Sequence, residues 1–425
     1  MASLHLGNFT ISTQMRGNSR FKKSSYYLNH GKYTEIKTSK YEFHFNLNGE
    51  IIFIRGLDKN WPHPSEHFKR TDGNDWVYYS VGDDSSENGI ISWLGEYYLP
   101  CLPYSSNSIW EQNHLSNPEI MNAFAAWSQL YANLHGLPRP GLSSETGDCI
   151  NQIIGNDETV LYHRSQELFS IMGERISVLP PDTRHVDYDV IPLMIADGCL
   201  YHCKFCCVQS ADRFQARSRT NIAGQIQELK RFFGQNIKNY NALFLGNHDA
   251  LQAGGEIIHF AATEAGTAFD FKESHGKKPM MFLFGSVDSF LKSENDLFDE
   301  IDRLPFYTYI NIGLESIDAA TLASIHKPIS SDKVGNAFRK MIDINRLYKH
   351  IEVTANFLIG AELSPDHYES LTELLRSAPV APRRKGAIYL SPLKDSPRKR
   401  ELLPRFYEIK KQSPLPVHVY LIQRL

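Results

Sequence analysis

The stretch that decides the fold is GCLYHCKFCC, residues 198–207, which contains the spacing C-x3-C-x2-C. It holds four of the six cysteines of the chain: Cys199, Cys203, Cys206 and Cys207. The other two, Cys101 and Cys149, are distant in the sequence and are interpreted most simply as small buried residues. Disulfides between such near neighbours would strain the loop, so the crowding indicates metal binding in a reducing compartment.

Three thiolates in one short loop suit an iron–sulfur cubane, because such clusters are bound by thiolates from irregular loops. The fourth iron then needs a ligand from elsewhere or stays open, and an open position distinguishes a metal site that does chemistry. Cys207 is not expected to be that ligand, because consecutive side chains of an extended loop point to opposite sides. The predicted metal ligands are therefore Cys199, Cys203 and Cys206.

A structural zinc site of the Cys3His type is the alternative, with His202 or His248 as its fourth ligand. Structural zinc sites usually take their ligands as two separated pairs. The sequence contains no second cysteine pair, which favours the iron–sulfur interpretation.

Strand and helix patterns alternate from residue 186 to residue 395. Apolar runs bounded by turn residues predict strands at 186–196, 241–247, 279–286, 307–313, 351–360 and 386–393. Apolar residues at helical spacing predict helices at 221–233, 290–304, 332–348 and 367–378. Six such units predict an α/β fold, a partial (β/α)6 parallel barrel whose ligands gather at the carboxyl ends of its strands.

The segments on either side of 186–395 differ from it in composition and in the pattern of their predicted helices and strands. Residues 1–180 are rich in aromatic residues, with a hairpin pattern at 41–56 that turns at Asn-Gly and a helical pattern at 118–136. They predict an N-terminal α+β extension that could serve as a substrate unit, joined by a linker at 178–187. Residues 396–425 are interpreted as a short basic C-terminal tail, because 383–411 holds ten Lys or Arg against three Asp or Glu. A solvated surface is the simpler reading of that charge, and an anionic partner or substrate is the alternative.

The cysteine loop resembles the signature of the radical S-adenosylmethionine (radical SAM) superfamily, C-x3-C-x-aromatic-C, with Phe205 as the aromatic residue. The resemblance implies a [4Fe–4S] cluster whose open iron is chelated by S-adenosylmethionine (SAM). It also implies a reductive cleavage of SAM that gives a radical, usually 5′-deoxyadenosyl. The cofactor makes the radical in such enzymes, and the protein positions and shields it.

Later segments are similar to the motifs of this family in the same order. Residues 246–249, GNHD, stand at the place of a turn that binds the methionine amino group, and 309–316, YINIGLES, is similar to a strand-four pattern. Residues 356–362, NFLIGAE, resemble a strand-five pattern that lies along adenine, with Asn356 in place of its first glycine. By resemblance Arg217 would pair with the methionine carboxylate, for which a guanidinium is well suited. The candidate cofactor-binding residues are Phe205, Arg217, Gly246, Asn247, His248, Asp249, Ser286, Glu315, Ser316, Asn356, Leu358, Gly360, Tyr389 and Leu390.

Features of specialised branches are absent from the sequence. No D-x-H-x-x-G motif of a cobalamin unit is present, and no cysteine follows Cys207 to hold an auxiliary cluster. The three extra cysteines that methylthiotransferases carry before the core are also missing. With a net charge of −3, no apolar run near the roughly 20 residues of a spanning helix and no signal-like start, we expect a cytoplasmic protein.

The sequence therefore predicts a single-cluster radical SAM enzyme that acts on a small-molecule or natural-product substrate. A reducing partner such as flavodoxin or ferredoxin is implied, and neither nucleic acid nor membrane is expected as a partner. One alternative is transfer of a 3-amino-3-carboxypropyl group from SAM within the same family. Another, of a different class, is a zinc-stapled module that holds RNA on the basic C-terminal segment. No catalytic residue beyond the cofactor contacts is identified.

Overall fold

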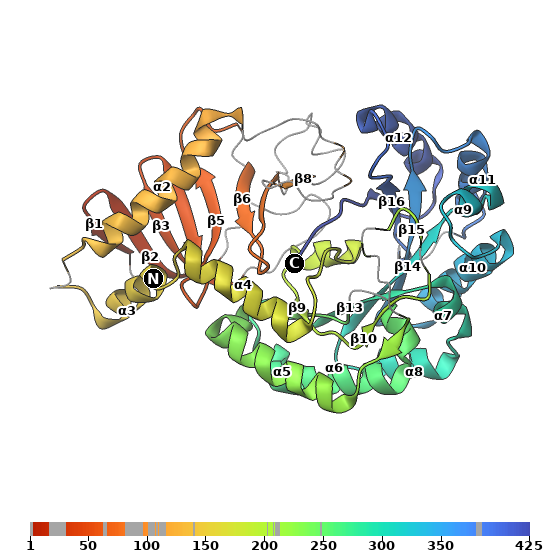
Figure 1. Ribbon diagram of the computed structural model, residues 1–425, viewed down its shortest axis with the longest axis horizontal. Helices are drawn as coiled ribbons and strands as arrows, with labels where there is room; N and C mark the ends of the chain where they lie inside the picture. The colour runs from red at the N-terminus through yellow and green to blue at the C-terminus, as the bar shows by residue number, and fades with distance from the viewer. Residues whose placement is uncertain are drawn as a thin grey trace.

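The described residues form two large sheets of different kinds, which Figure 1 shows side by side, and one short two-stranded sheet. The computed structural model describes residues 3–16, 31–62, 66–80, 97–100, 107, 109, 116–138, 141–201, 203–206, 208, 213–246, 249–379 and 385–425. An antiparallel sheet forms the N-terminal half, and a parallel sheet with helices around it forms the C-terminal half. None of the helices in these ranges is long and apolar enough to cross a membrane.

The N-terminal sheet is an antiparallel meander whose strands follow one another in chain order. They are β1 (Ser3–Leu6), β2 (Phe9–Arg16), β3 (Lys32–Thr38), β4 (Tyr41–Phe45), β5 (Ile51–Gly56), β6 (Glu66–Arg70), β7 (Trp76–Ser80) and β8 (Tyr97–Pro100). The hairpin predicted at 41–56 is the β4–β5 pair. Gly49 in its turn has φ +82°, and a Cβ there would lie 2.6 Å from the backbone of Gln152, so only glycine fits.

Two helices, α2 (Pro118–His135) and α3 (Ser144–Ile154), pack on the apolar face of this sheet, and a third, α4 (Glu158–Met172), runs from this core to the barrel, whose core its residues Leu168 and Met172 join. The helix predicted at 118–136 is α2, which begins at the cap residue Asn117. Alternate strand residues such as Phe43 and Ile54 are fully buried against Trp127 and its neighbours on α2. The extension is thus α+β with an apolar core of its own.

The parallel sheet has the strand order of the chain, from β9 to β17, and every pair in it is parallel. Its strands are β9 (Ile191–Pro192), β12 (Ala242–Phe244), β13 (Met280–Gly285), β14 (Tyr307–Glu315), β15 (Ile351–Ile359), β16 (Ile388–Pro392) and β17 (Val417–Val419). A short antiparallel pair, β10 (Ala196–Asp197) with β11 (Gln215–Ala216), lies beside β9. The strands β9 and β17 are the two edges of the sheet and do not pair with each other, so the sheet is an open, partial barrel.

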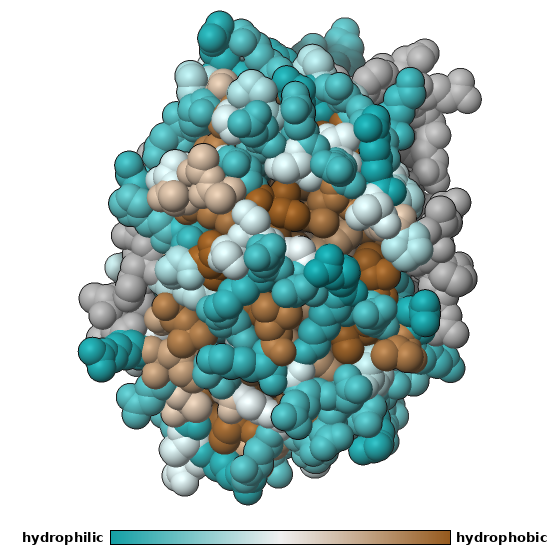
Figure 2. Space-filling view, turned by 90° about the vertical axis from the view of Figure 1, so that its right-hand side faces the viewer, coloured by the Kyte–Doolittle hydropathy of each residue, from teal (hydrophilic) through white to brown (hydrophobic). Residues whose placement is uncertain are grey.

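Helices cover the convex side of this sheet and form the outer arc in Figure 1. They are α5 (Arg219–Phe233), α6 (Gly255–Phe269), α7 (Val287–Lys292), α8 (Asn295–Arg303), α9 (Ala319–Ser324), α10 (Ser331–Leu347), α11 (Pro365–Arg376) and α12 (Leu403–Gln412). On α10 the buried residues Val334, Phe338 and Met341 recur at helical spacing and face the sheet. Figure 2, which looks onto this side of the molecule, shows hydrophilic side chains over most of the surface.

Two sequence-based expectations are corrected here. The sheet has seven strands instead of six, because β17 joins it from the segment interpreted as a solvated tail, where Phe406 and Ile409 of α12 are buried. The linker expected at 178–187 is largely a 3-10 helix, η3 (Pro181–Val186), and its Asp182 and Thr183 are buried. Both segments are parts of the barrel rather than connections outside it.

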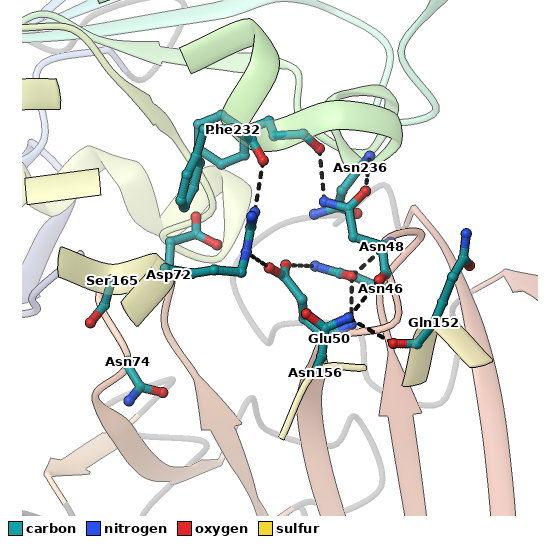
Figure 3. Close-up of polar contacts among 12 residues, drawn as sticks. Asn46, Asn48, Glu50, Asp72, Asn74, Gln152, Asn156, Ser165, Phe232 and Asn236 are labelled. Atoms are coloured by element: carbon teal, nitrogen blue, oxygen red, sulfur yellow. Dashed lines mark hydrogen bonds and ion pairs between the residues drawn. The ribbon is translucent and has the colours of Figure 1, made fainter. Parts of the chain in front are cut away.

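The N-terminal extension docks mainly on the rim where the barrel strands begin. Figure 3 shows polar contacts from Asn48 and its neighbours to the segment that leads from α5 into β12. Asn48 Nδ2 donates to the carbonyl of Phe233 (2.9 Å), and an Arg164 guanidinium nitrogen donates to that of Phe232 (2.7 Å). Asn107 of the extension reaches the opposite end, where its Nδ2 donates to Ser391 Oγ (3.1 Å), near the carboxyl end of β16.

Candidate active site

The cysteine loop follows β9 and β10 at the carboxyl end of the first barrel strand. Cys203 is buried, and Cys199 and Cys206 are half-buried, with no disulfide among them. The loop closes on itself where the Cys206 N–H donates to the Cys203 carbonyl (3.2 Å). Another backbone bond, from Lys204 to the Ile325 carbonyl (3.1 Å), ties the loop to the segment after α9. Cys207 lies outside the described residues.

Two of the thiols accept hydrogen bonds from backbone N–H groups of their own loop. Tyr201 N lies 3.4 Å from Cys199 Sγ, and Val208 N lies 3.4 Å from Cys206 Sγ. Burial raises the pKa of the Cys199 and Cys203 thiols, while the Lys327 ammonium lowers the pKa of both. N–H donors and a nearby cation both favour the thiolate, which is the form that binds metal.

Asp249 is a buried carboxylate behind the cysteine loop. Its Oδ1 accepts from Ser286 N (3.0 Å) and from Ser289 Oγ (2.7 Å), at the start of α7. Its Oδ2 is buried and has no hydrogen-bond partner among the described residues. Burial raises the pKa of Asp249. Asp249 follows β12, which pairs with β9, so it stands at the strand end next to the cysteine loop. A buried acceptor without a donor is costly, so this oxygen is suited to receive a donor from a bound molecule.

Glu315 ends β14 in an unusual conformation. Its φ is +62°, and the β14–β15 register shifts between Gly313 and Glu315. The buried carboxylate lies 3.3 Å from Lys327 Nζ, and burial raises its pKa although Lys327 opposes the shift. The next residue, Ser316, is held by His367, whose Nδ1 lies 2.7 Å from the hydroxyl oxygen. A non-glycine residue with positive φ is strained, and such strain concentrates at functional sites.

The other candidates on β15 and β16 lie on or beside the concave face with their polar groups engaged. Asn356 and Asn311 form a reciprocal amide pair (2.7 and 3.1 Å). The Tyr389 hydroxyl donates to Asp182 Oδ1 (2.7 Å), and burial raises the pKa of Asp182 to about 7. The Tyr368 hydroxyl lies within hydrogen-bond distance of both the N–H and the carbonyl of Gly360.

The remaining candidates are placed as follows. The carbonyls of Leu358 and Leu390 are paired with His367 and Tyr420, respectively. Gly246 has φ +86° and is buried after β12, and Phe205 packs against the main core. Asn247 and His248 lie outside the described residues.

Arg217 has a partner that the sequence did not reveal. Its guanidinium binds the Asp197 carboxylate through Nε (2.9 and 3.1 Å) and Nη2 (2.6 Å). The two residues are brought together by the β10–β11 pair at the base of the cysteine loop. The predicted contact to the methionine carboxylate stays a prediction, and it would compete with this ion pair.

Tyr201 and Asp197 were missed by the sequence analysis, and Lys327 was considered only as one of two possible ion-pair partners of Glu315, with Arg303 as the other. Tyr201 donates to Asp288 Oδ2 (2.6 Å), and the Lys327 ammonium lies 5.5 Å from the Tyr201 ring centroid. Lys327 comes twelve residues after Glu315 with no motif of its own, so only the path of the chain after β14 places it here.

A second group of metal-ligand types, Glu35, Glu42 and His44, gathers on the N-terminal sheet. The carboxylates there are already compensated, because Lys37 lies 2.8 Å from Glu35 and Arg55 lies 2.8 Å from Glu42. These contacts describe a row of ion pairs across β3, β4 and β5 rather than an empty cation site.

A partial parallel barrel with three unbridged thiols at the carboxyl end of its first strand defines the class of radical SAM enzymes. In agreement, the family model described as "Radical SAM superfamily" matches residues 193–375. Residues 193–375 therefore form a radical SAM domain, and this family implies a [4Fe–4S] cluster and SAM. No curated protein matches the chain significantly.

Solved structures to which the chain is similar include three enzymes. A radical SAM methyltransferase from Sphaerobacter thermophilus is 17% identical, with TM-score 0.37 over 54% of this chain and 64% of that one. The cobalamin-dependent SAM radical enzyme OxsB is 14% identical, with TM-score 0.34 over 53% of this chain and 31% of that one. Methylornithine synthase PylB is 10% identical, with TM-score 0.32 over 61% and 75%. The chain spans less than two thirds of the first two, and similarity at this level identifies no substrate.

The residues present fit the cluster and SAM. The three thiols are unbridged, and two of them accept N–H donors from the loop. The unpaired Asp249 oxygen offers an acceptor for an ammonium group next to the cysteine loop. The family's cofactors and the donors of this site are therefore chemically matched.

Proposed function

We propose that this protein reductively cleaves SAM at a [4Fe–4S] cluster and directs the resulting 5′-deoxyadenosyl radical at a small-molecule or natural-product substrate. The observation that carries the proposal is Asp249 Oδ2, which is buried and has no hydrogen-bond partner among the described residues. Asp249 follows β12, the strand that pairs with β9 and so lies next to the cysteine loop. A carboxylate oxygen without a donor, next to a loop of metal-binding thiols, matches the ammonium of a cluster-bound amino acid. When bound, the cluster and SAM supply the electron transfer and the radical.

The roles of the side chains follow from their positions. Cys199, Cys203 and Cys206 would bind three irons, and Asp249 would accept hydrogen bonds from the methionine ammonium. Glu315, at the carboxyl end of β14, would accept hydrogen bonds from SAM, since charge-assisted bonds of this kind are strong. Leu358 and Gly360 would lie along adenine, as the family resemblance implies.

The N-terminal extension, proposed as residues 1–180, would contribute to substrate recognition through Asn107. This residue is fully buried and lies between Ser391 Oγ (3.1 Å) and the Tyr420 carbonyl (2.8 Å). Ser391 is paired in register with Leu358, so Asn107 reaches the barrel at the level of the proposed adenine contacts. The proposed core is 186–395, and a reducing partner such as flavodoxin or ferredoxin would supply the electron.

The test is anaerobic reconstitution with iron and sulfide, followed by addition of SAM and a one-electron reductant. Release of 5′-deoxyadenosine supports the proposal. Methylthioadenosine as the sole product would indicate 3-amino-3-carboxypropyl transfer instead, and a colourless protein that retains zinc would exclude both reactions.

A further inference from the structure

Lys327 is a buried lysine beside the cysteine loop. Its side chain is 5% exposed, and lysine is almost never buried this deeply without a partner. The partner is Glu315, whose Oε1 lies 3.3 Å from the ammonium and whose side chain is 9% exposed. The ammonium also lies 5.5 Å from the ring centroid of Tyr201, which stands in the sequence between Cys199 and Cys203.

The backbone fixes this lysine in place. Lys327 N donates to the Leu322 carbonyl (3.0 Å), and Ile329 N donates to the carbonyl of Lys327 (2.9 Å). The same segment receives the cysteine loop, through the bond from Lys204 N to the Ile325 carbonyl. The loop and the lysine are therefore held to one framework, and the distance between them is built into the fold.

The ion pair with Glu315 does not use the whole ammonium group. A lysine ammonium has three donors, and among the described residues this one makes a single hydrogen bond, a long one of 3.3 Å. A buried charge with an incomplete set of partners is costly. The remaining donors are therefore suited to face a further negative charge.

The positive end of the pair is the end that meets the cysteine loop. The Lys327 ammonium lies 5.5 Å from the ring centroid of Tyr201, which belongs to the loop. Among the described residues, the hydrogen bond of the Glu315 carboxylate goes to Lys327 and not to the loop. The charge that contacts the loop is therefore that of the ammonium.

We propose that Lys327 is a positioning residue that holds a fixed positive charge beside the cluster thiolates and so favours reduction of the cluster. The proposal rests on the proposed function. One electron enters from a one-electron reductant and no bond is made or broken, so the added negative charge is what the ammonium stabilises. Because the site is buried, this attraction is screened by salt far less than an exposed one.

The test is a potentiometric titration of the reconstituted protein without SAM, followed by electron paramagnetic resonance. Lys327→Met should lower the equilibrium constant for one-electron reduction about tenfold, which is a potential more negative by about 59 mV. Lys327→Arg keeps the charge and should restore the wild-type potential. Glu315→Gln removes the opposing carboxylate and should move the potential in the positive direction.

Lys333→Met is the matched control. Lys333 is 49% exposed and pairs with Asp288 (2.6 Å), which in turn bonds Tyr201 of the same loop. The substitution removes a positive charge that is close to the loop but exposed to solvent. Solvent and salt screen such a charge, so the reduction potential should not change. An equal shift in this variant would assign the effect to general charge and would overturn the proposal.

The outcomes separate this inference from the proposed function. If the wild-type protein holds no cluster, both fail. If Lys327→Met keeps its iron and its potential, only this inference fails, and a loss of SAM affinity would then assign the ammonium to the SAM carboxylate. If Lys327→Met loses its iron, the potential of Glu315→Gln becomes the test. An unchanged or more negative potential in Glu315→Gln also overturns the proposal.

Discussion

The Tyr201 hydroxyl donates a 2.6 Å hydrogen bond to Asp288, and this bond ties the loop between Cys199 and Cys203 to the start of α7. Asp288 also accepts from Lys333 Nζ (2.6 Å). Burial alone would raise the pKa of Asp288, but the bonds from Lys333 and Tyr201 hold it below its usual value. The carboxylate thus stays ionised and anchors the loop from outside the thiols.

Replacing Tyr201 by Phe should loosen the cysteine loop without removing a ligand. A hydrogen bond to a charged group contributes about 1.5–3 kcal/mol, so the reconstituted cluster should lose iron to a chelator on the order of tenfold faster. The measurement is the decay of visible absorbance after chelator is added. Tyr348→Phe removes a similar bond to Asp299 (2.9 Å) far from the loop and should leave the decay unchanged. Equal rates for both variants and wild type would refute the anchoring role.

The cysteine assignment makes opposite predictions for two neighbouring thiols. Cys203→Ala should abolish cluster formation, because Cys203 is a proposed ligand of the loop. Cys207→Ala should keep the full iron content, since Cys207 is expected to face away from the other three. Iron and sulfide analysis after reconstitution provides the measurement, and Cys149→Ala, half-buried beside Thr34, serves as the control. Loss of iron in the Cys207 variant would contradict the assignment.

Asp249→Asn should weaken SAM binding while leaving the cluster intact. The amide can keep an oxygen toward Ser286 N and Ser289 Oγ, but it places a donor where the unpaired Oδ2 now lies. Loss of a charge-assisted bond should raise the dissociation constant of SAM about tenfold or more, which is about 1.4 kcal/mol. Titration of SAM into the reconstituted variant measures it. Asp318→Asn, which alters only the cap of α9, should bind SAM as the wild type does.

The barrel could be predicted because its signals are local. Strand and helix patterns alternate along the core, and the cysteine loop marks the carboxyl end of the first strand, where the family fold places it. The strand β17 was missed because it is three residues long and lies just after Pro414 and Pro416, so it carries no periodic signal. In the N-terminal extension the sequence analysis used the Asn-Gly turn of one hairpin and overlooked Asp72-Gly73 between β6 and β7. The order of the eight strands depends on pairings that no single segment specifies.

The sequence predicted where the candidate site lies but not which of its side chains contact one another. Motif order gives the strand ends at which Asp249 and Glu315 stand. It does not give their partners, because Glu315 meets Lys327 through the segment after α9, and Ser316 meets His367 on α11, 51 residues away. Such contacts are set by which helices and strands become neighbours in the barrel, and local patterns carry no information on them.

The last prediction concerns Asp72, where the extension meets the barrel. Burial raises the pKa of Asp72 to about 7, although the Tyr240 hydroxyl (2.7 Å) opposes the shift. The folded state therefore binds an extra proton between about pH 4 and 7, and the free energy of unfolding should fall as pH rises through this window, by up to about 4 kcal/mol. Asp72→Asn cannot ionise, so its urea-unfolding free energy should fall less from pH 5 to pH 8. The exposed Asp343→Asn should follow the wild-type curve, and a parallel curve for Asp72→Asn would refute the prediction.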